Sequence, residues 1–210
     1  MSDARPGRPR ALVALTGAWL AAVAAGMGVM IRYAATPGDA GAPPASWPAD
    51  SSIPRTAGQP ILVLMAHPRC PCTRATIEEL ARLMRRLSGR LDARVLFYAP
   101  AGATEDWWKS DLWASVAAIP GVTPILDGDA VEAGRFHAQT SGHALLYDAA
   151  GRLLFSGGIT GARGHAGDNA GVGAVEALMR GDASIGRTTP VFGCALHAAQ
   201  ATAQAPEGRR

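Results

Sequence analysis

The sequence predicts an α/β domain with a mixed β-sheet flanked by helices, preceded by one N-terminal transmembrane helix. Three features support this: a long uncharged run near the N-terminus, short apolar runs that alternate with amphipathic segments, and a late hairpin pattern. The 210 residues suit one ordinary domain with extensions and are too few for two full domains. Hydrophobic residues make up 48% and charged residues 18%, which excludes a highly charged disordered protein.

The N-terminal run is typical of a membrane anchor. Residues 11–31 contain no charged residue, and 21 residues are enough to cross a hydrocarbon core as a helix. Cleavable signal peptides usually carry a shorter apolar run, so the length favours an uncleaved signal-anchor helix at residues 11–34. The three arginines within residues 1–10 predict a cytoplasmic N-terminus, with the rest of the chain exported.

Two further segments lack the pattern of a folded core. Residues 35–58 are rich in Pro, Gly and Ala and have no periodic apolar face, so they predict an extended linker. Residues 198–210 contain no large apolar residue and predict a disordered tail. The folded domain is therefore expected to span residues 59–197.

The first half of the domain alternates strand and helix patterns. Residues 61–66 (ILVLMA) are a continuous apolar run, as expected for a strand buried on both faces. Residues 73–87 carry apolar side chains at helical spacing, with charged side chains on the other faces. A second strand is expected at residues 94–99 and a second helix at residues 104–119. The short apolar run at residues 122–127 predicts a third strand or an edge.

The second half predicts a hairpin and a last helix. Residues 143–147 and 152–156 are apolar runs separated by Asp-Ala-Ala-Gly, which is a hairpin pattern. A glycine-rich stretch follows at residues 157–173, and residues 174–180 predict a short helix. Strands and helices that alternate in this order imply a mixed sheet with helices on both faces.

Charge and cysteine content exclude two classes of protein. The formal net charge is +3, but three basic residues lie in the first ten positions and two are the last two residues. No basic face with interleaved aromatic residues is present, so we expect no nucleic-acid partner. The three cysteines are an odd number and too few for a disulfide scaffold.

The Cys70-Pro71-Cys72 motif is the strongest chemical signal. It falls between a predicted buried strand and an amphipathic helix, where free backbone N–H groups stabilise a thiolate. Arg69 and Arg74 add positive charge, and Pro71 stiffens the turn. A second thiol nearby can resolve a mixed disulfide. The alternative is that both cysteines are simply small buried side chains.

A strand, a cysteine pair and a helix, followed by a hairpin reading LLYDAAGRLLFSG, resemble the thioredoxin-like superfamily. The hairpin is similar to that of the membrane-tethered, exported branch. The segments HPRCPCTRATIEEL, TSGHALLYDAAGRLLFSGGIT, RGHAGDN and VFGCAL also resemble a small group of bacterial proteins called RedB. The resemblance covers residues 59–179. It implies a thioredoxin-like fold in the periplasm, held by a single pass in a bacterial inner membrane, with Cys70 as the attacking thiol and Cys72 as the resolving thiol.

Two features depart from the superfamily pattern. The usual redox motif has two residues between its cysteines, whereas Pro71 alone separates them here. A disulfide across one residue closes a small ring and is expected to be strained and easily reduced. The superfamily also has a cis-proline before the third core strand, and residues 140–143 occupy that place without a proline.

Cys194 opens two alternatives. If the C-terminal segment folds back over the motif, Cys194 could resolve a disulfide in place of Cys72. Together with Cys70, Cys72 and His67, it could instead bind copper or zinc, and His197 has a suitable spacing from it. Exported copper chaperones of the Sco type, which share the fold, also use two cysteines and a histidine. The simpler interpretation of His67 is a surface residue before a turn.

The glycine-rich stretch carries Arg163, His165 and Asp168 but lacks the context of a nucleotide-binding loop. Arg163 and His165 could bind an anion or polarise the thiols, or an Arg–Asp pair could tie the loop down.

The sequence therefore predicts a membrane-anchored periplasmic protein that exchanges disulfides with protein thiols and requires no cofactor. The alternatives are a copper- or zinc-binding, delivery or redox-sensing protein, and a redox-inert module that binds a partner through the RGHAGDN loop. The candidate catalytic residues are Cys70, Cys72 and Cys194, with His67, Pro71, Arg74, Arg163 and His165 in support.

Overall fold

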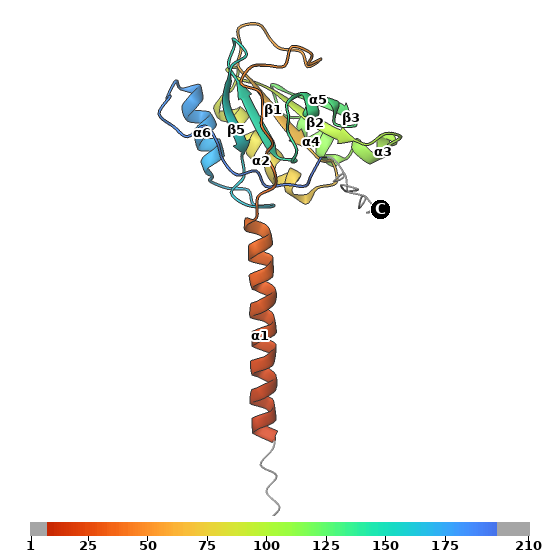
Figure 1. Cartoon of the computed structure of the whole chain (residues 1–210), viewed down its shortest axis with the longest axis vertical. Helices are drawn as coiled ribbons and strands as arrows, with labels where there is room; N and C mark the ends of the chain where they lie inside the picture. Colours follow the sequence, from red (N-terminus) through yellow and green to blue (C-terminus); the bar gives the residue numbers. More distant parts are fainter. Residues whose placement is uncertain (1–7, 197–210) are drawn as a thin grey trace, which may run out of the picture. The chain divides into compact units, whose positions relative to one another are not determined.

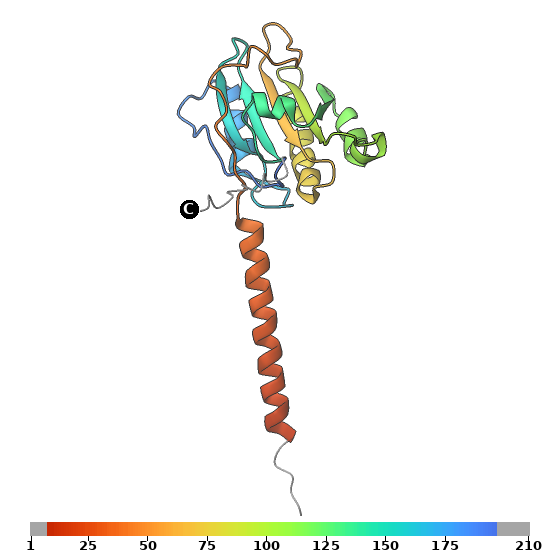
Figure 2. The same ribbon diagram turned by 45° about the vertical axis from the view of Figure 1, so that its right-hand side comes forward.

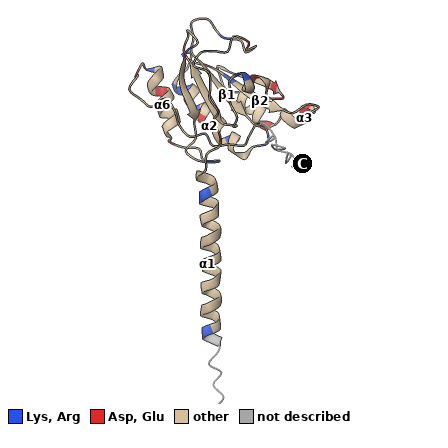
Figure 3. Ribbon diagram, viewed as in Figure 1, with Lys and Arg blue, Asp and Glu red and all other residues tan. Residues whose placement is uncertain are grey.

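The computed structural model describes residues 8–196, and a boundary between Thr36 and Pro37 divides the chain into two compact units. The first unit contains helix α1 (Arg8–Ala35), which carries no charged side chain between Arg10 and Arg32 (Figure 3). Its large apolar side chains are exposed. Within residues 8–196, α1 is the one helix long and apolar enough to cross a membrane, by length and composition.

The second unit is a five-stranded sheet with helices against it (Figure 1). The strands are β1 (Ile61–Ala66), β2 (Asp92–Ala99), β3 (Val122–Gly128), β4 (His143–Tyr147) and β5 (Leu153–Gly158). The helices are α2 (Pro71–Arg86), α3 (Glu105–Trp108), α4 (Asp111–Ala117), α5 (Val131–Arg135) and α6 (Ala170–Met179).

The order across the sheet is β3-β2-β1-β4-β5. Strand β1 runs parallel to β2 and antiparallel to β4; β2 runs parallel to β3, and β4 and β5 form the predicted hairpin. Figure 2 shows the same sheet turned by 45° about the vertical axis. A mixed sheet in this order, flanked by helices, is the thioredoxin-like α/β fold that the resemblance implies.

Two apolar clusters cover the two faces of the sheet. One cluster joins β1, β2 and β4 to α2, α4 and α6 through residues such as Leu80, Val116 and Val175. The other cluster lies on the opposite face and includes Phe136, which follows α5, and Tyr147 of β4. Strand β1 is central and fully buried, and the loop that follows it leads directly into α2.

The helix expected at residues 104–119 is instead two short helices, α3 and α4, separated at Lys109 and Ser110. The tryptophans of the two helices have different partners, which explains the break. Trp107 in α3 packs against Tyr98, whereas Trp113 in α4 packs against Phe97. Adjacent residues of β2 point to opposite faces of the sheet, so one straight helix does not reach both.

Helix α5 has no counterpart among the predicted elements. The buried Asp127 carboxylate at the end of β3 accepts hydrogen bonds from the Glu132 and Ala133 N–H groups, at 2.8 and 2.9 Å. This satisfies backbone donors that a short helix leaves unpaired. The last helix also begins earlier than residue 174, because the Asn169 side chain accepts a hydrogen bond from the Val172 N–H and caps α6.

The segment expected to be an extended linker lies against the domain from residue 37 onward. Ile53 is buried, and the Trp47 ring packs edge-on against Phe136 and Tyr147. The Glu132 carboxylate accepts hydrogen bonds from the Ser51 and Ser52 hydroxyls, at 2.8 and 2.7 Å. These side chains cover the second apolar cluster, a role that Pro, Gly and Ala content does not reveal.

Candidate functional site

Cys70 occupies the position just before the first turn of α2, directly after the loop that leaves β1. Its backbone is extended and Pro71 is the first helical residue, so the first N–H groups of α2 lie beside the sulfur. The Cys70 N–H donates to the His67 carbonyl at 3.1 Å, and the Thr73 N–H donates to the Cys70 carbonyl at 3.0 Å. Both Cys70 and Cys72 are buried.

Cys194 lies beside Cys70, although 124 positions separate them in the sequence. The two Sγ atoms are 2.8 Å apart, with the Cys194 thiol as hydrogen-bond donor. Residues 187–196, which we name the C-terminal strap, carry Cys194 to this place. The strap pairs with the loop before β4: the Ser141 N–H donates to the Cys194 carbonyl at 2.8 Å, and Thr140 and Ala195 form an antiparallel bridge.

The glycine before Cys194 makes this close approach feasible. A Cβ on Gly193 would lie 1.8 Å from the Ser141 carbonyl oxygen, so only glycine fits at this position. The Arg163 guanidinium donates a hydrogen bond to the Gly193 carbonyl, which fixes the strap from the other side.

The three thiols titrate differently. Burial opposes ionisation of Cys70, but hydrogen bonds from the Cys194 thiol and from the Cys72, Cys194 and Thr73 N–H groups outweigh it and lower the pKa of Cys70. Burial and the neighbouring Cys70 thiolate raise the pKa of Cys72. Burial and the hydrogen bond to Cys70 raise the pKa of Cys194 to about 12. Cys70 is therefore the thiol most readily ionised at neutral pH.

A buried hydroxyl braces the loop between β1 and α2. Ser141 Oγ accepts a hydrogen bond from the His67 N–H at 3.0 Å and contacts Thr73 Oγ1 at 3.0 Å. The His67 ring is half-buried between Tyr98 and Trp107, with 5.6 Å between ring centroids in each pair. Burial lowers the pKa of His67, so its ring is neutral near pH 7.

The other supporting residues predicted from sequence divide into two groups. The positive charge of Arg163 lowers the pKa values of Cys72 and Cys194, against the larger effect of burial, and so acts on the thiols. His165 lies next to it and contacts the Arg163 carbonyl through Nδ1 at 2.9 Å. Arg74 instead pairs with the Asp111 carboxylate on the exposed surface, with 2.5 Å between nitrogen and oxygen.

The described part of the chain contains no arranged set of metal ligands of the kind that the copper- or zinc-binding alternative requires. No group of three or more His, Cys, Asp or Glu side chains is placed to hold a metal ion among residues 8–196. His197 lies outside the described residues.

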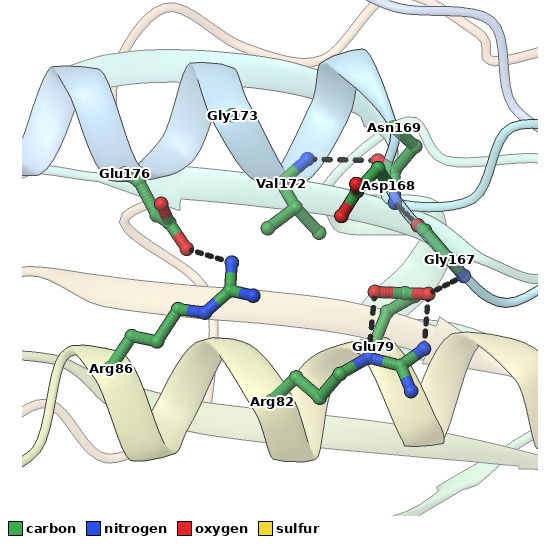
Figure 4. Close-up of a pocket in the computed structure, with 9 residues that line it drawn as sticks. All are labelled: Glu79, Arg82, Arg86, Gly167, Asp168, Asn169, Val172, Gly173 and Glu176. Carbon is green, nitrogen blue, oxygen red and sulfur yellow. Dashed lines mark hydrogen bonds and ion pairs between the residues drawn. The ribbon is translucent and has the colours of Figure 1, made fainter.

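A concave site lies between α2 and α6, and none of the three cysteines lines it (Figure 4). This cavity of about 480 Å³ is lined mainly by charged and small residues. Its cations face carboxylates: Arg82 pairs with Glu79, and Arg86 pairs with Glu176 at 2.8 Å. The buried Glu79 also accepts a hydrogen bond from the Gly167 N–H, which ties the glycine-rich loop to α2. The two arginines are therefore paired with Glu79 and Glu176, and Glu79 also helps to hold the loop in place.

Sequence reasoning missed Ser141 and Gly193 as parts of the site. Residues 140–143 were singled out only for lacking a proline, and within residues 8–196 every peptide bond is trans. Gly193 precedes the third cysteine, and a glycine beside a reactive residue is the signal that could have pointed to a close backbone approach.

Neither a protein-family model nor a curated protein matches the chain. A hypothetical protein from Sinorhizobium meliloti is similar in structure, with 23% identity, a TM-score of 0.56, and 77% of this chain and 93% of that one covered. An uncharacterized conserved protein from Geobacillus kaustophilus has 16% identity and a TM-score of 0.57, with 78% and 93% covered. At these identities the similarity shows only that the chains share a fold, and the mixed five-stranded sheet with its flanking helices fits the thioredoxin-like α/β fold.

Proposed function

We propose that this chain is a thiol–disulfide oxidoreductase that acts on protein thiols or disulfides from the periplasmic side of a bacterial inner membrane. The observation that carries the proposal is the 2.8 Å contact between the sulfurs of Cys70 and Cys194. Two sulfurs at this separation are poised to form a disulfide with little backbone movement. Helix α1, with its exposed apolar side chains, supports the membrane anchor.

The reaction begins at Cys70, because its lowered pKa gives the largest thiolate fraction. The Cys70 thiolate attacks one sulfur of a substrate disulfide. That S–S bond breaks, the other substrate sulfur leaves as a thiolate and takes up a proton, and a mixed disulfide remains on Cys70.

We assign resolution of the mixed disulfide to Cys194, because its sulfur lies 2.8 Å from that of Cys70. Its thiol loses a proton to water and attacks the Cys70 sulfur, and the second substrate sulfur leaves as a thiolate. The substrate gains two electrons and two protons, and the protein ends with a Cys70–Cys194 disulfide. The same steps in reverse oxidise a substrate dithiol. Cys72 remains a third thiol: the pKa values of Cys72 and Cys194 are both raised, so the short contact between the Cys194 and Cys70 sulfurs is what favours Cys194 as the resolving thiol.

The experiment is trapping of the mixed disulfide. The detergent-solubilised, reduced chain is mixed with a model protein disulfide, quenched with acid and analysed by mass spectrometry. We expect Cys194→Ser to accumulate the mixed disulfide on Cys70, and Cys70→Ser to form none. Cys72→Ser is the matched control, since it removes a neighbouring thiol and keeps the proposed pair. Accumulation in Cys72→Ser in place of Cys194→Ser would assign resolution to Cys72, and no adduct in any variant would refute the proposal.

A further inference from the structure

The first half of the C-terminal strap is fixed along β5. The Ser156 N–H donates to the Arg187 carbonyl at 2.9 Å, and the Thr189 hydroxyl donates to the Gly158 carbonyl at 2.8 Å. A Cβ on Gly157 would lie 2.2 Å from Thr189 Oγ1, so the glycine permits this close packing. The strap therefore has a firm base before it reaches the thiols.

The second half of the strap, residues 193–196, is held in a different way. Its two backbone hydrogen bonds run from the Ser141 N–H to the Cys194 carbonyl and from the Leu196 N–H to the Gln139 carbonyl, at 2.8 and 2.9 Å. They join alternate residues of two antiparallel segments, which is how an extended peptide adds to an exposed strand edge.

The register of this pairing determines what reaches Cys70. Ala195 lies opposite Thr140, and the preceding residue, Cys194, then has its sulfur against that of Cys70. The strap thus has the form of a cysteine-bearing peptide docked beside a reactive thiol, although it belongs to the same chain.

We infer that residues 193–196 are an internal competitor that occupies the backbone edge of residues 139–141, so that an extended, cysteine-bearing segment of a substrate protein docks there only after the strap has left. The inference rests on the proposed function and adds what must move before the substrate docks. Gln139 and Ser141 offer an acceptor and a donor that a second peptide can use in the same register once the strap leaves.

This competition sets the order of strap release, substrate docking and disulfide exchange. The strap leaves the edge, the substrate segment pairs with it, and the Cys70 thiolate attacks the substrate disulfide to form the mixed disulfide. When the strap returns, Cys194 attacks the Cys70 sulfur, the substrate sulfur leaves as a thiolate, and the strap takes back the edge. Formation of the Cys70–Cys194 bond is thereby coupled to release of the product.

The test uses the reduced, detergent-solubilised full chain and two synthetic peptides. Both copy residues 190–196 (PVFGCAL) with blocked ends and carry 5-thio-2-nitrobenzoate on the cysteine, so that attack by Cys70 releases a coloured thiolate. In the second peptide the residue matching Leu196 is N-methylated, which removes the N–H that would donate to Gln139. The free reagent, 5,5′-dithiobis(2-nitrobenzoate), reports the reactivity of Cys70 without docking.

We expect the unmodified peptide to react about 2- to 10-fold faster than the N-methylated one, which is the contribution of one backbone hydrogen bond. Gly193→Ala forces the strap away from Ser141, so it should raise the rate with the unmodified peptide relative to the free reagent. Leu196→Ala, which removes a buried strap side chain, should do the same and serves if Gly193→Ala does not fold.

Two outcomes separate the two proposals. Equal rates for the two peptides, with no gain in either strap variant, would overturn the docking edge while leaving disulfide exchange at Cys70 intact. If Cys70 reacts neither with the peptides nor with the free reagent, the proposed function itself fails.

Discussion

The two sulfurs of the candidate site come from regions that are built in opposite ways. Cys70 belongs to a continuous stretch, β1 followed by α2, whose burial and helix start are encoded within neighbouring residues. Cys194 belongs to the C-terminal strap, which has no helix or strand of its own and is positioned by pairing with residues distant in sequence. The first region sets where a thiolate is stable, and the second decides which group faces it.

The difference is visible in the titration of two chemically identical side chains. The Cys194 thiol and nearby backbone N–H groups donate hydrogen bonds to Cys70 and lower its pKa against the effect of burial, whereas burial and the hydrogen bond to Cys70 raise the pKa of Cys194 to about 12. Of two neighbouring thiols, the one that accepts the hydrogen bonds therefore becomes the nucleophile, and the one that donates does not.

The largest expected effect comes from removing the thiol that faces Cys70. Cys194→Ala deletes a hydrogen bond to the Cys70 thiolate, so the apparent pKa of Cys70 should rise by about 1 to 2 units, the value of one hydrogen bond to a charged group. The midpoint of the pH–rate profile for alkylation of Cys70 measures it. Cys72→Ala is the control and should move this midpoint less than Cys194→Ala does, because the Cys72 backbone N–H remains. An unmoved midpoint in Cys194→Ala contradicts the contact.

Removal of the Ser141 hydroxyl should give the next largest effect, because Ser141 contacts both the loop before α2 and the strap. Ser141→Ala removes the hydroxyl that pairs with the His67 N–H and Thr73 while its backbone still holds the strap. Leaving these buried groups unpaired should cost about 1–3 kcal/mol in the free energy of unfolding. Denaturant unfolding followed by tryptophan fluorescence measures the loss. A stability equal to wild type would show that the brace is not a structural requirement.

The segment at residues 37–60 is attached to the domain by long-range contacts, as the strap is. One group that holds it is titratable: the Glu132 carboxylate of α5, which accepts hydrogen bonds from Ser51 and Ser52. Burial alone would raise the pKa of Glu132, but hydrogen bonds from Ser52, Ser51 and Arg135 outweigh it and lower the pKa. The carboxylate therefore contributes stability above its unfolded pKa of about 4.3, and the contribution is lost as the pH falls through the lower folded pKa.

Glu132→Gln should accordingly reduce the free energy of unfolding by about 1–2 kcal/mol at pH 7. The difference between variant and wild type should shrink below about pH 4.5, as the wild-type carboxylate becomes protonated. Urea unfolding at a series of pH values measures both. A difference that stays constant with pH would mean that the charge of Glu132 does not hold the segment.

The smallest effect is expected at Arg74, which the sequence places near the thiols and the structure pairs with Asp111 at the surface. Arg74→Ala should leave the free energy of unfolding almost unchanged, since exposed ion pairs contribute little. The alkylation midpoint of Cys70 should not move. A shift in that midpoint would show that the charge of Arg74 influences the ionisation of Cys70.

Part of the fold could be predicted from local patterns. The uncharged run predicts α1, the apolar run predicts β1, and Asp-Ala-Ala-Gly predicts the turn between β4 and β5. The split between α3 and α4 could not be predicted, because Trp107 and Trp113 pack against partners on opposite faces of β2. The packing of Trp47 was missed for a similar reason: its ring partners, Phe136 and Tyr147, lie far along the chain.

What the sequence determined by itself is the place of Cys70, because a buried strand, a proline and an amphipathic helix are adjacent and fix the local backbone. What only the tertiary structure decided is which group faces it. Hydrogen bonds between the strap and the loop before β4 bring Cys194 to Cys70, and such pairing depends on the geometry of segments about 50 residues apart, which no local pattern of residues records.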